Sequence, residues 1–284
     1  MANRHLGWAM ALAMCPICSE DEDIELVRVL DDGRRLVRHR CGQEWEHGEP
    51  RAERKRPSYS FDDLRARFPK PEDVEPGRME RANRLKAQFL ATRPGPDPTV
   101  AAYWAKYQNI FSADGLWTCD PQLLKDFANS DVGAHPGNQS MFNSAWNTMG
   151  EAAAADSTRR TIEYLLHGPA SVPLEDRLEH LLSGAKPFAM TGFKEALLTK
   201  VLCVVQPDRF LPILKYTTAA DGKREIARKV YGLELPAPES VNWTRGRLVL
   251  WSNDVLHALV GDGLADREHA SAFLWWAKDR PTEL

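Results

Sequence analysis

The stretch from residue 188 to residue 224 constrains the fold most, because it joins a turn, an apolar helix and a run of cations. Gly192 permits a tight turn, and apolar residues then recur at helical spacing until Pro207 interrupts them. This pattern predicts a turn that opens a buried helix. The same stretch is expected to place cations on the turn, on the outer face of the helix and on the loop beyond it, namely Lys194, Lys200, Arg209, Lys215, Lys223 and Arg224.

These cations allow two interpretations. Backbone amides at a helix start, joined by lysines, form a receptor for phosphate oxygens. An ordinary core helix with a solvated basic face would have the same composition, so the choice between them depends on the rest of the chain.

The composition limits the classes of protein that are possible. The 284 residues, 43% of them hydrophobic, suffice for one large or two smaller domains with a packed core. The net charge of -3 argues against an indiscriminate nucleic-acid coat, so any polyanion must be bound by local clusters. No run approaches the roughly 18 apolar residues of a membrane span, so we expect a cytoplasmic protein without a membrane partner. Residues 1–14 are predicted to be a structureless leader.

Residues 15–50 predict a small zinc-binding module. A CxxC pair precedes two short strands that are joined by an Asp-Gly turn, and a third cysteine follows the second strand. Cysteine-bearing turns at the base of such a hairpin present thiolates to one zinc ion. A regular ribbon would have a second CxxC, but Arg38 stands in its place. The predicted ligands are Cys15, Cys18 and Cys41, with the fourth position open between His39, ranked slightly ahead because it shares the face of Cys41, and His47.

This module resembles the zinc ribbons common in bacterial nucleic-acid-associated proteins, and the resemblance covers residues 15–47. Such ribbons also serve as structural staples or protein docks. The following residues, 51–98, have the charged, proline-rich composition of a linker, with a short helix predicted over 80–91.

Residues 99–284 are predicted to form one all-helical domain. Apolar residues recur at helical spacing, and Asp120 followed by Pro121 is typical of a helix start. The fold class is therefore mainly α, with a small β zinc module. Further helices are predicted over 140–149, 158–167, 174–182, 221–231, 245–260 and 267–278.

Several phrases of this domain resemble the helical region that precedes the ATPase in McrB-like modification-dependent restriction proteins. They are GNQSMFNSAWN at 137–147, LEDRLEHLL at 174–182, GFKEALLTKVLCVVQPDRFLPIL from residue 192, and FLWWAKD from residue 273. The resemblance implies a specificity module that senses modified DNA, such as DNA carrying 5-methylcytosine, in restriction or phage defence. It also implies a nuclease or ATPase partner protein.

The turn at Thr191 and Gly192 also looks like a helix-hairpin-helix DNA clamp of the glycosylase type. That motif has a second glycine where Lys194 stands, so the resemblance does not extend to catalysis. Other catalytic signatures are missing from the sequence: there is no GxxxxGK[ST] loop, no GxSxG elbow and no zinc-protease histidine pattern. Ile213 occupies the place where a metal nuclease would need an acid. We therefore expect no enzymatic activity.

The sequence thus predicts a non-catalytic protein that binds double-stranded DNA, in a modified form. Two other classes stay open: a zinc-ribbon adaptor that docks other proteins, and a cryptic nuclease or glycosylase-like enzyme. Reading a modified base requires aromatic walls and amide groups, or apolar contact with the 5-methyl group. The candidate DNA-binding residues are Gly192, Lys194, Lys200, Lys215, Tyr216, Arg224, Asn138, Asn143, Trp146, Trp117 and Asn253.

Overall fold

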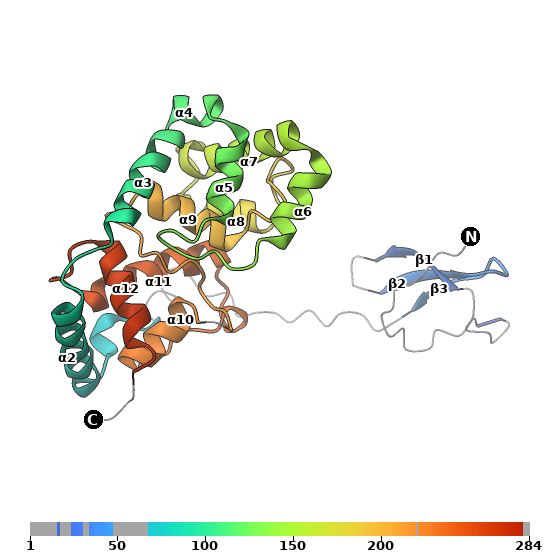
Figure 1. The fold of residues 1–284 in the computed structure, drawn as a ribbon. Coiled ribbons are helices and arrows are strands. Elements are labelled where there is room, and N and C mark those ends of the chain that lie inside the picture. The colour runs from blue at the N-terminus through green and yellow to red at the C-terminus, as the bar shows by residue number, and fades with distance from the viewer. Residues whose placement is uncertain (1–15, 18–23, 31–33, 48–67, 220, 281–284) are drawn as a thin grey trace. The chain divides into compact units, whose positions relative to one another are not determined.

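A computed structural model describes residues 16–17, 24–30, 34–47, 68–219 and 221–280. The chain divides into two compact units, Met1–Ser58 and Tyr59–Leu284. The first contains a three-stranded antiparallel sheet in the order β1-β2-β3 (Figure 1). The first two strands confirm the predicted hairpin, whereas the third was not predicted. Their bounds are β1 (Ile24–Val29), β2 (Arg35–His39) and β3 (Glu44–His47).

The second unit is helical, and it begins within the segment predicted to be a linker. There η1 (Pro71–Asp73) precedes α2 (Pro76–Thr92), whose residues Ala82, Leu85 and Phe89 are buried. The short helix predicted over 80–91 is confirmed as α2, which is longer than predicted, but it is part of the packed core and not of a linker, because its apolar residues lie on one face and are buried. The misleading prolines include one at the first turn of α2 and one at the first turn of the next helix, where proline is well tolerated.

The remaining helices form two parts of this unit (Figure 1). The upper part of the view contains α3 (Pro98–Ile110), α4 (Ala113–Thr118), α5 (Pro121–Asn129), α6 (Ser140–Met149), α7 (Glu151–His167), α8 (Leu174–Leu182) and α9 (Glu195–Val205). The lower part contains α2, α10 (Lys223–Ile226), the π-helical η2 (Ala227–Tyr231), η3 (Pro238–Ser240), α11 (Arg245–Val260) and α12 (Arg267–Ala277).

Local capping explains where many of these helices begin. Asp97, Asp120 and Asp266 each accept a hydrogen bond from a backbone amide in the first turn of the helix that follows. Such caps satisfy amides that have no partner within the helix. The predicted bounds of α6, α8 and α11 are confirmed. Sequence analysis missed α4 and placed the start of α7 too late.

The helix α9 lies at the centre of the core. Every residue from Ala196 to Val204 is buried, which confirms the predicted buried helix. A helix that is buried all round has no outer face on which to display cations. No helix of the described residues is long and apolar enough to cross a membrane.

Candidate functional site

Other groups of the protein fill the space around the turn before α9, where a phosphate was expected to bind. Gly192 has φ of 81°, and a Cβ atom there would lie 2.4 Å from the backbone nitrogen of Phe142. The first residue of α9 is Glu195, whose carboxylate accepts a hydrogen bond from the Tyr216 amide at 2.6 Å and lies 3.8 Å from Arg245. The negative charge at this helix start weakens its attraction for phosphate. Of the cations predicted around it, Lys194 is exposed.

The expected outward position of Lys200 is wrong. Its side chain is 1% exposed, and its ammonium group donates hydrogen bonds to the backbone carbonyls of Phe127 and Ser130. Burial lowers the pKa of Lys200 to about 8. Lys223, also expected on the surface, is fully buried and donates to the carbonyl of Val249 at 3.3 Å. These lysines satisfy internal carbonyls, so neither presents its charge to DNA.

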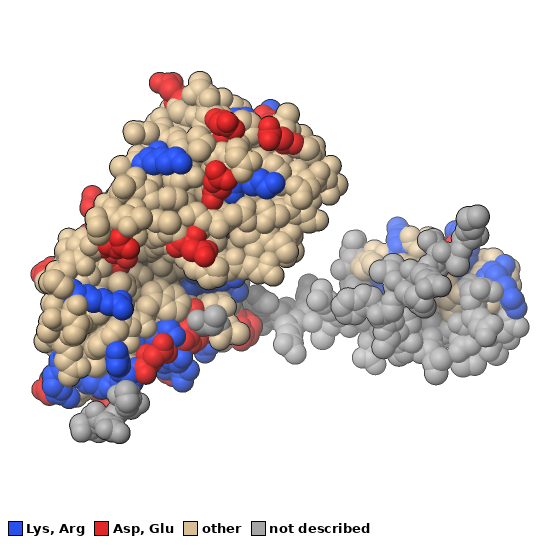
Figure 2. All heavy atoms as spheres, in the orientation of Figure 1, with Lys and Arg blue, Asp and Glu red and all other residues tan. Residues whose placement is uncertain are grey.

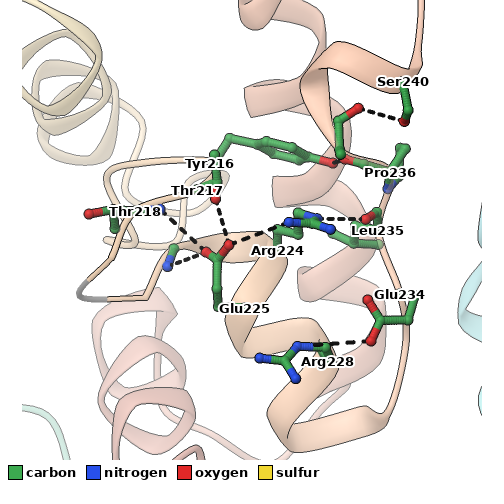
Figure 3. Close-up of polar contacts among 12 residues, drawn as sticks. Tyr216, Thr217, Thr218, Arg224, Glu225, Arg228, Glu234, Leu235, Pro236 and Ser240 are labelled. Atoms are coloured by element: carbon green, nitrogen blue, oxygen red, sulfur yellow. Dashed lines mark hydrogen bonds and ion pairs between the residues drawn. The ribbon is translucent and has the colours of Figure 1, made fainter.

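Three further candidates make structural contacts. Tyr216 is fully buried, and its hydroxyl donates to the carbonyl of Pro236 at 2.7 Å (Figure 3). Asn253 is also fully buried, with its side-chain carbonyl accepting from the Leu211 amide at 3.0 Å. Burial therefore contradicts the DNA-binding role predicted for both. Arg224 is half-buried and donates from Nε to the carbonyl of Leu235 at 2.9 Å.

The residues predicted to read a base do not converge on one site. Trp146 is buried against Phe142, with ring centroids 5.5 Å apart, so it belongs to the core and not to an open aromatic wall. Asn138 accepts from the Ser140 amide at 2.8 Å at the start of α6. Asn143 pairs with Asn129 through side-chain hydrogen bonds of 2.7 and 3.0 Å. The exposed Trp117 donates a hydrogen bond to Glu163 at 3.0 Å.

Glu225 joins the two ends of the loop between Lys215 and Gly222 through its carboxylate (Figure 3). The carboxylate of Glu225 accepts hydrogen bonds from the Gly222 amide at 2.8 Å and from the Thr217 hydroxyl at 2.5 Å. A Cβ atom on Gly222 would lie 2.8 Å from the carbonyl oxygen of Lys215, so the loop closes tightly on itself. Asp221, with φ of 73°, accepts from Lys229 and from Lys278 at 2.7 and 2.8 Å. These contacts restrain the described residues of the loop, 215–219 and 221–222.

A cavity of about 690 Å³ lies where the two parts of the helical unit meet. Five segments line it: the start of α3, residues 131–137, Ala196 of α9, the loop residues 212–218 with Asp221, and one face of α12. Its size is typical of sites for small molecules and cofactors. Lys215, a predicted DNA-binding residue, lines this cavity.

A second candidate surface lies on α2 and η2, which pack against each other. Each of α2 and the segment Lys223–Tyr231 contains four basic residues and one acidic residue, and one basic residue of each, Arg81 and Lys223, is buried. Figure 2 shows lysines and arginines gathered over the lower part of the helical unit. We call the set Arg78, Arg84, Arg228, Lys229 and Arg280 the α2–η2 face.

Arg81 lies beneath the α2–η2 face, beside two of its arginines. Its side chain is 4% exposed and donates to the backbone carbonyls of Val230 and Arg280. Burial lowers the pKa of Arg81, and the neighbouring charges of Arg78 and Arg84 lower it further. Like charges depress the pKa of a cation in this way where the local potential is positive.

The sheet of the first unit brings two predicted zinc ligands together. His39 Nδ1 lies 3.1 Å from Cys41 Sγ, and the His39 side chain is buried. The chain enters β1 at Ile24, which pairs with His39, whereas His47 pairs with Arg35 at the other end of β2. This register favours His39 over His47 as the fourth ligand. Cys15 and Cys18 lie outside the described residues, within which no group of three metal ligands occurs.

Sequence analysis missed the residues on α12 that line the cavity. Glu268, Ser271, Ala272 and Trp275 recur at spacings of three and four, which places them on one face of the helix. Their spacing and the tryptophan could have marked that face as a site. The arginines of α2 were missed because their helix was assigned to a linker.

Comparisons of this chain with protein families, with curated proteins and with solved structures gave no match. The resemblances drawn from the sequence therefore stay predictions.

Proposed function

We propose that this protein binds double-stranded DNA through the α2–η2 face, without chemistry of its own. The observation that carries the proposal is the group of exposed and half-buried cations on two adjacent helices, Arg78, Arg84, Arg228 and Lys229, in a chain whose net charge is -3. DNA phosphates are attracted to such a local cluster even when the whole protein is acidic. This face replaces the α9 turn that the sequence favoured.

The arginines of this face are available for phosphate. The Arg84 and Arg228 side chains are 58% and 53% exposed, and each lies 3.9 Å from its carboxylate partner, Glu80 or Glu234. Exposed ion pairs of this length contribute little to stability, so phosphate oxygens can compete with the carboxylates. An arginine can also hold a phosphate through two parallel hydrogen bonds.

The resemblance to McrB-like proteins supports a more specific form of the proposal, in which the protein senses modified DNA in restriction or phage defence with a nuclease or ATPase partner. The first unit would then be a zinc ribbon held by Cys15, Cys18, His39 and Cys41. The contact between His39 and Cys41 supports this ligand set, because two zinc ligands must lie within a few ångströms of each other.

The test is equilibrium binding of one duplex, methylated and unmethylated, at two salt concentrations. Arg84→Glu and Arg228→Glu reverse charges on the α2–η2 face. Lys194→Glu reverses an exposed charge at the start of α9, and Lys106→Glu does so on α3 as a control outside both. We expect the two arginine variants to weaken binding to both duplexes alike. The salt dependence should fall by about one counterion for each phosphate that a variant no longer neutralises.

Each outcome distinguishes between the candidate DNA-binding surfaces or between the candidate classes of protein. Loss of binding in Lys194→Glu alone would return the interface to the α9 turn and overturn the α2–η2 assignment. Equal effects of all four variants would indicate a nonspecific attraction, and would also overturn it. A preference for methylated DNA that survives higher salt would support the modification reader. No binding of the wild type at low salt would leave the zinc-ribbon adaptor as the better interpretation.

A further inference from the structure

The walls of the cavity between the two parts of the helical unit are held in place by contacts with the residues packed around them. On one side, Gly133 has φ of 76°, and a Cβ atom there would lie 2.6 Å from Trp104 Nε1. The carbonyl of Ser130, at the start of the same wall, accepts from the buried Lys200. On the other side, Asp221 is held by two lysines. A cavity with such walls is formed before any ligand arrives, which reduces the entropy lost on binding.

The lining combines an apolar wall with an aromatic ring. Val100, Val132, Leu214 and Ala272 contribute the apolar surface, and Trp275 contributes a half-buried indole. The ring of Trp275 has a cation on one side, since Lys278 Nζ lies 5.2 Å from its centroid. Flat ligands bind in sites of this kind by stacking on the ring while apolar side chains cover their other surface.

Carboxylates supply the polar part of the lining. Glu268 is half-buried on the same face of α12 as Trp275, one turn of helix from the almost fully buried Ser271. Asp97 lines the cavity nearby and accepts from the Thr99 amide at the start of α3. Burial raises the pKa of the Glu268 carboxyl; the backbone amide of Asp97 donates to it and opposes this rise, while the carboxylates of Asp266 and Asp97 add to it.

Two other carboxylates of the cavity are already paired with basic groups, and the lining also contains the cation Lys215. Asp131 pairs with His135 at 2.6 Å, and Asp221 pairs with Lys229 and Lys278. Glu268 is therefore the acidic group best placed to meet a ligand. A carboxylate accepts N–H groups, and a carboxyl that takes up a proton can also donate to a ring nitrogen. A keto oxygen in the place of an amino group would face the lone pairs of a carboxylate and be repelled.

We propose that this cavity binds a flat nitrogen heterocycle with an exocyclic amino group, stacked on Trp275 and hydrogen-bonded by Glu268. Cytosine and adenine have this chemistry, and the ligand could come either as a free nucleoside or as a base turned out of a duplex. The second source rests on the proposed DNA-binding function, whereas the first does not. Turning a base out of the stack costs a few kcal/mol, so an unpaired base would bind most readily.

The test uses matched nucleosides that differ in the amino group. Cytidine and uridine form one pair, and adenosine and inosine form the other; binding to the full chain is measured by calorimetry. We expect the amino member of each pair to bind at least tenfold more tightly. Glu268→Gln should bring the ratio close to one, because an amide can donate as well as accept. Glu234→Gln, which changes an exposed carboxylate outside the cavity, should leave the ratio unchanged.

A second arm identifies the source of the ligand. Duplexes that carry one unpaired cytosine or one unpaired uracil opposite an abasic position are titrated with the wild type, Glu268→Gln and Arg84→Glu. If the base comes from DNA, the wild type prefers the unpaired cytosine, Glu268→Gln loses the preference, and Arg84→Glu weakens both duplexes alike. If the ligand is free, the nucleosides show the tenfold ratio and the duplexes show no preference.

The two proposals fail in different ways. Nucleoside binding with the tenfold ratio but no binding of any duplex would overturn the DNA-binding function and leave the cavity assignment intact. DNA binding with no preference in either arm would overturn the cavity assignment alone. Because Trp275→Leu could destabilise α12, that variant is used only to confirm stacking, where it should weaken both members of each pair equally.

Discussion

The ammonium group of Lys200 donates a hydrogen bond to the backbone carbonyl of Ser130 from within the core of the helical unit. Its second acceptor is the carbonyl of Phe127, at 3.3 Å. Both carbonyls lie at the end of α5, where backbone groups have no partner within the helix. Lys200 therefore joins α9 to the segment that forms one wall of the cavity.

The stability of the protein should depend on pH through Lys200. In the folded protein its pKa is about 8, below the value of 10.5 expected when unfolded, so the unfolded chain binds more protons between these values. The free energy of unfolding therefore rises with pH from about 8 to 10.5. Below pH 8 the folded protein carries the full free-energy cost of burying the charged ammonium group. Relative to Lys200→Met, the wild type should gain roughly 3 kcal/mol across this window.

The measurement is denaturant unfolding of both proteins at several pH values from 7 to 10.5. Lys223, whose pKa is also lowered to about 8, is present in both proteins, so its contribution cancels in the difference. A difference in stability that stays constant with pH would mean that Lys200 keeps its proton throughout.

Replacing Gly192 should show how closely the turn before α9 packs on α6. Gly184 has nearly the same φ, 80° against 81°, but a Cβ atom on it would meet nothing within 4 Å. We expect Gly184→Ala to cost about 1–2 kcal/mol through its backbone conformation alone. Gly192→Ala should cost about 3 kcal/mol or more, because its Cβ also meets the backbone of Phe142. Unfolding by urea measures both, and equal losses would show that the turn moves aside.

Removing the Glu225 carboxylate should loosen the loop from Lys215 to Gly222. Glu225→Ala removes the acceptor of the Gly222 amide and the Thr217 hydroxyl. Amide exchange at Gly222 should accelerate by at least tenfold, while exchange in α11 stays slow, because local opening exposes the freed amide. Glu234→Ala, which removes an exposed partner of Arg228, is the control. Unchanged exchange at Gly222 would mean that the loop holds its shape without this carboxylate.

Measuring zinc content should show which of the two candidate histidines, His39 or His47, is the fourth zinc ligand. We expect His39→Ala to lower zinc content below one ion per chain and to weaken the sheet of the first unit, whereas His47→Ala keeps one ion. The reason is the register, which puts His39 beside Cys41 and His47 opposite Arg35. Elemental analysis of the purified full chain gives the stoichiometry. Full zinc content in both variants would remove the histidines from the ligand set, and wild-type protein without zinc would overturn the metal site itself.

The helices were predictable because their signals are local. Apolar spacing together with a stop residue located Leu174–Leu182, and a similar pattern located Arg245–Val260. The burial of Lys200 was not predictable from local signals. Sequence analysis assumed that α9 has a solvent-exposed face, but helices pack around all of α9 and bury that face. The cavity was missed for a related reason: Val100, Val132, Leu214 and Trp275 come together only through tertiary packing.

The contact of α2 with α12 has a consequence for how the protein is made. Phe89 of α2 packs on Phe273 and Trp276, and Arg81 donates to the carbonyl of Arg280, which lies 199 residues further along the chain. A ribosome adding about 5–20 residues per second needs roughly 10–40 s to produce that partner. During this interval the face of α2 that packs on α12 lacks its partner, although η2, which also packs on α2, is made earlier. A chain that ended before α12 would lack the aromatic partners of Phe89, so α2 could not complete its packing in that chain.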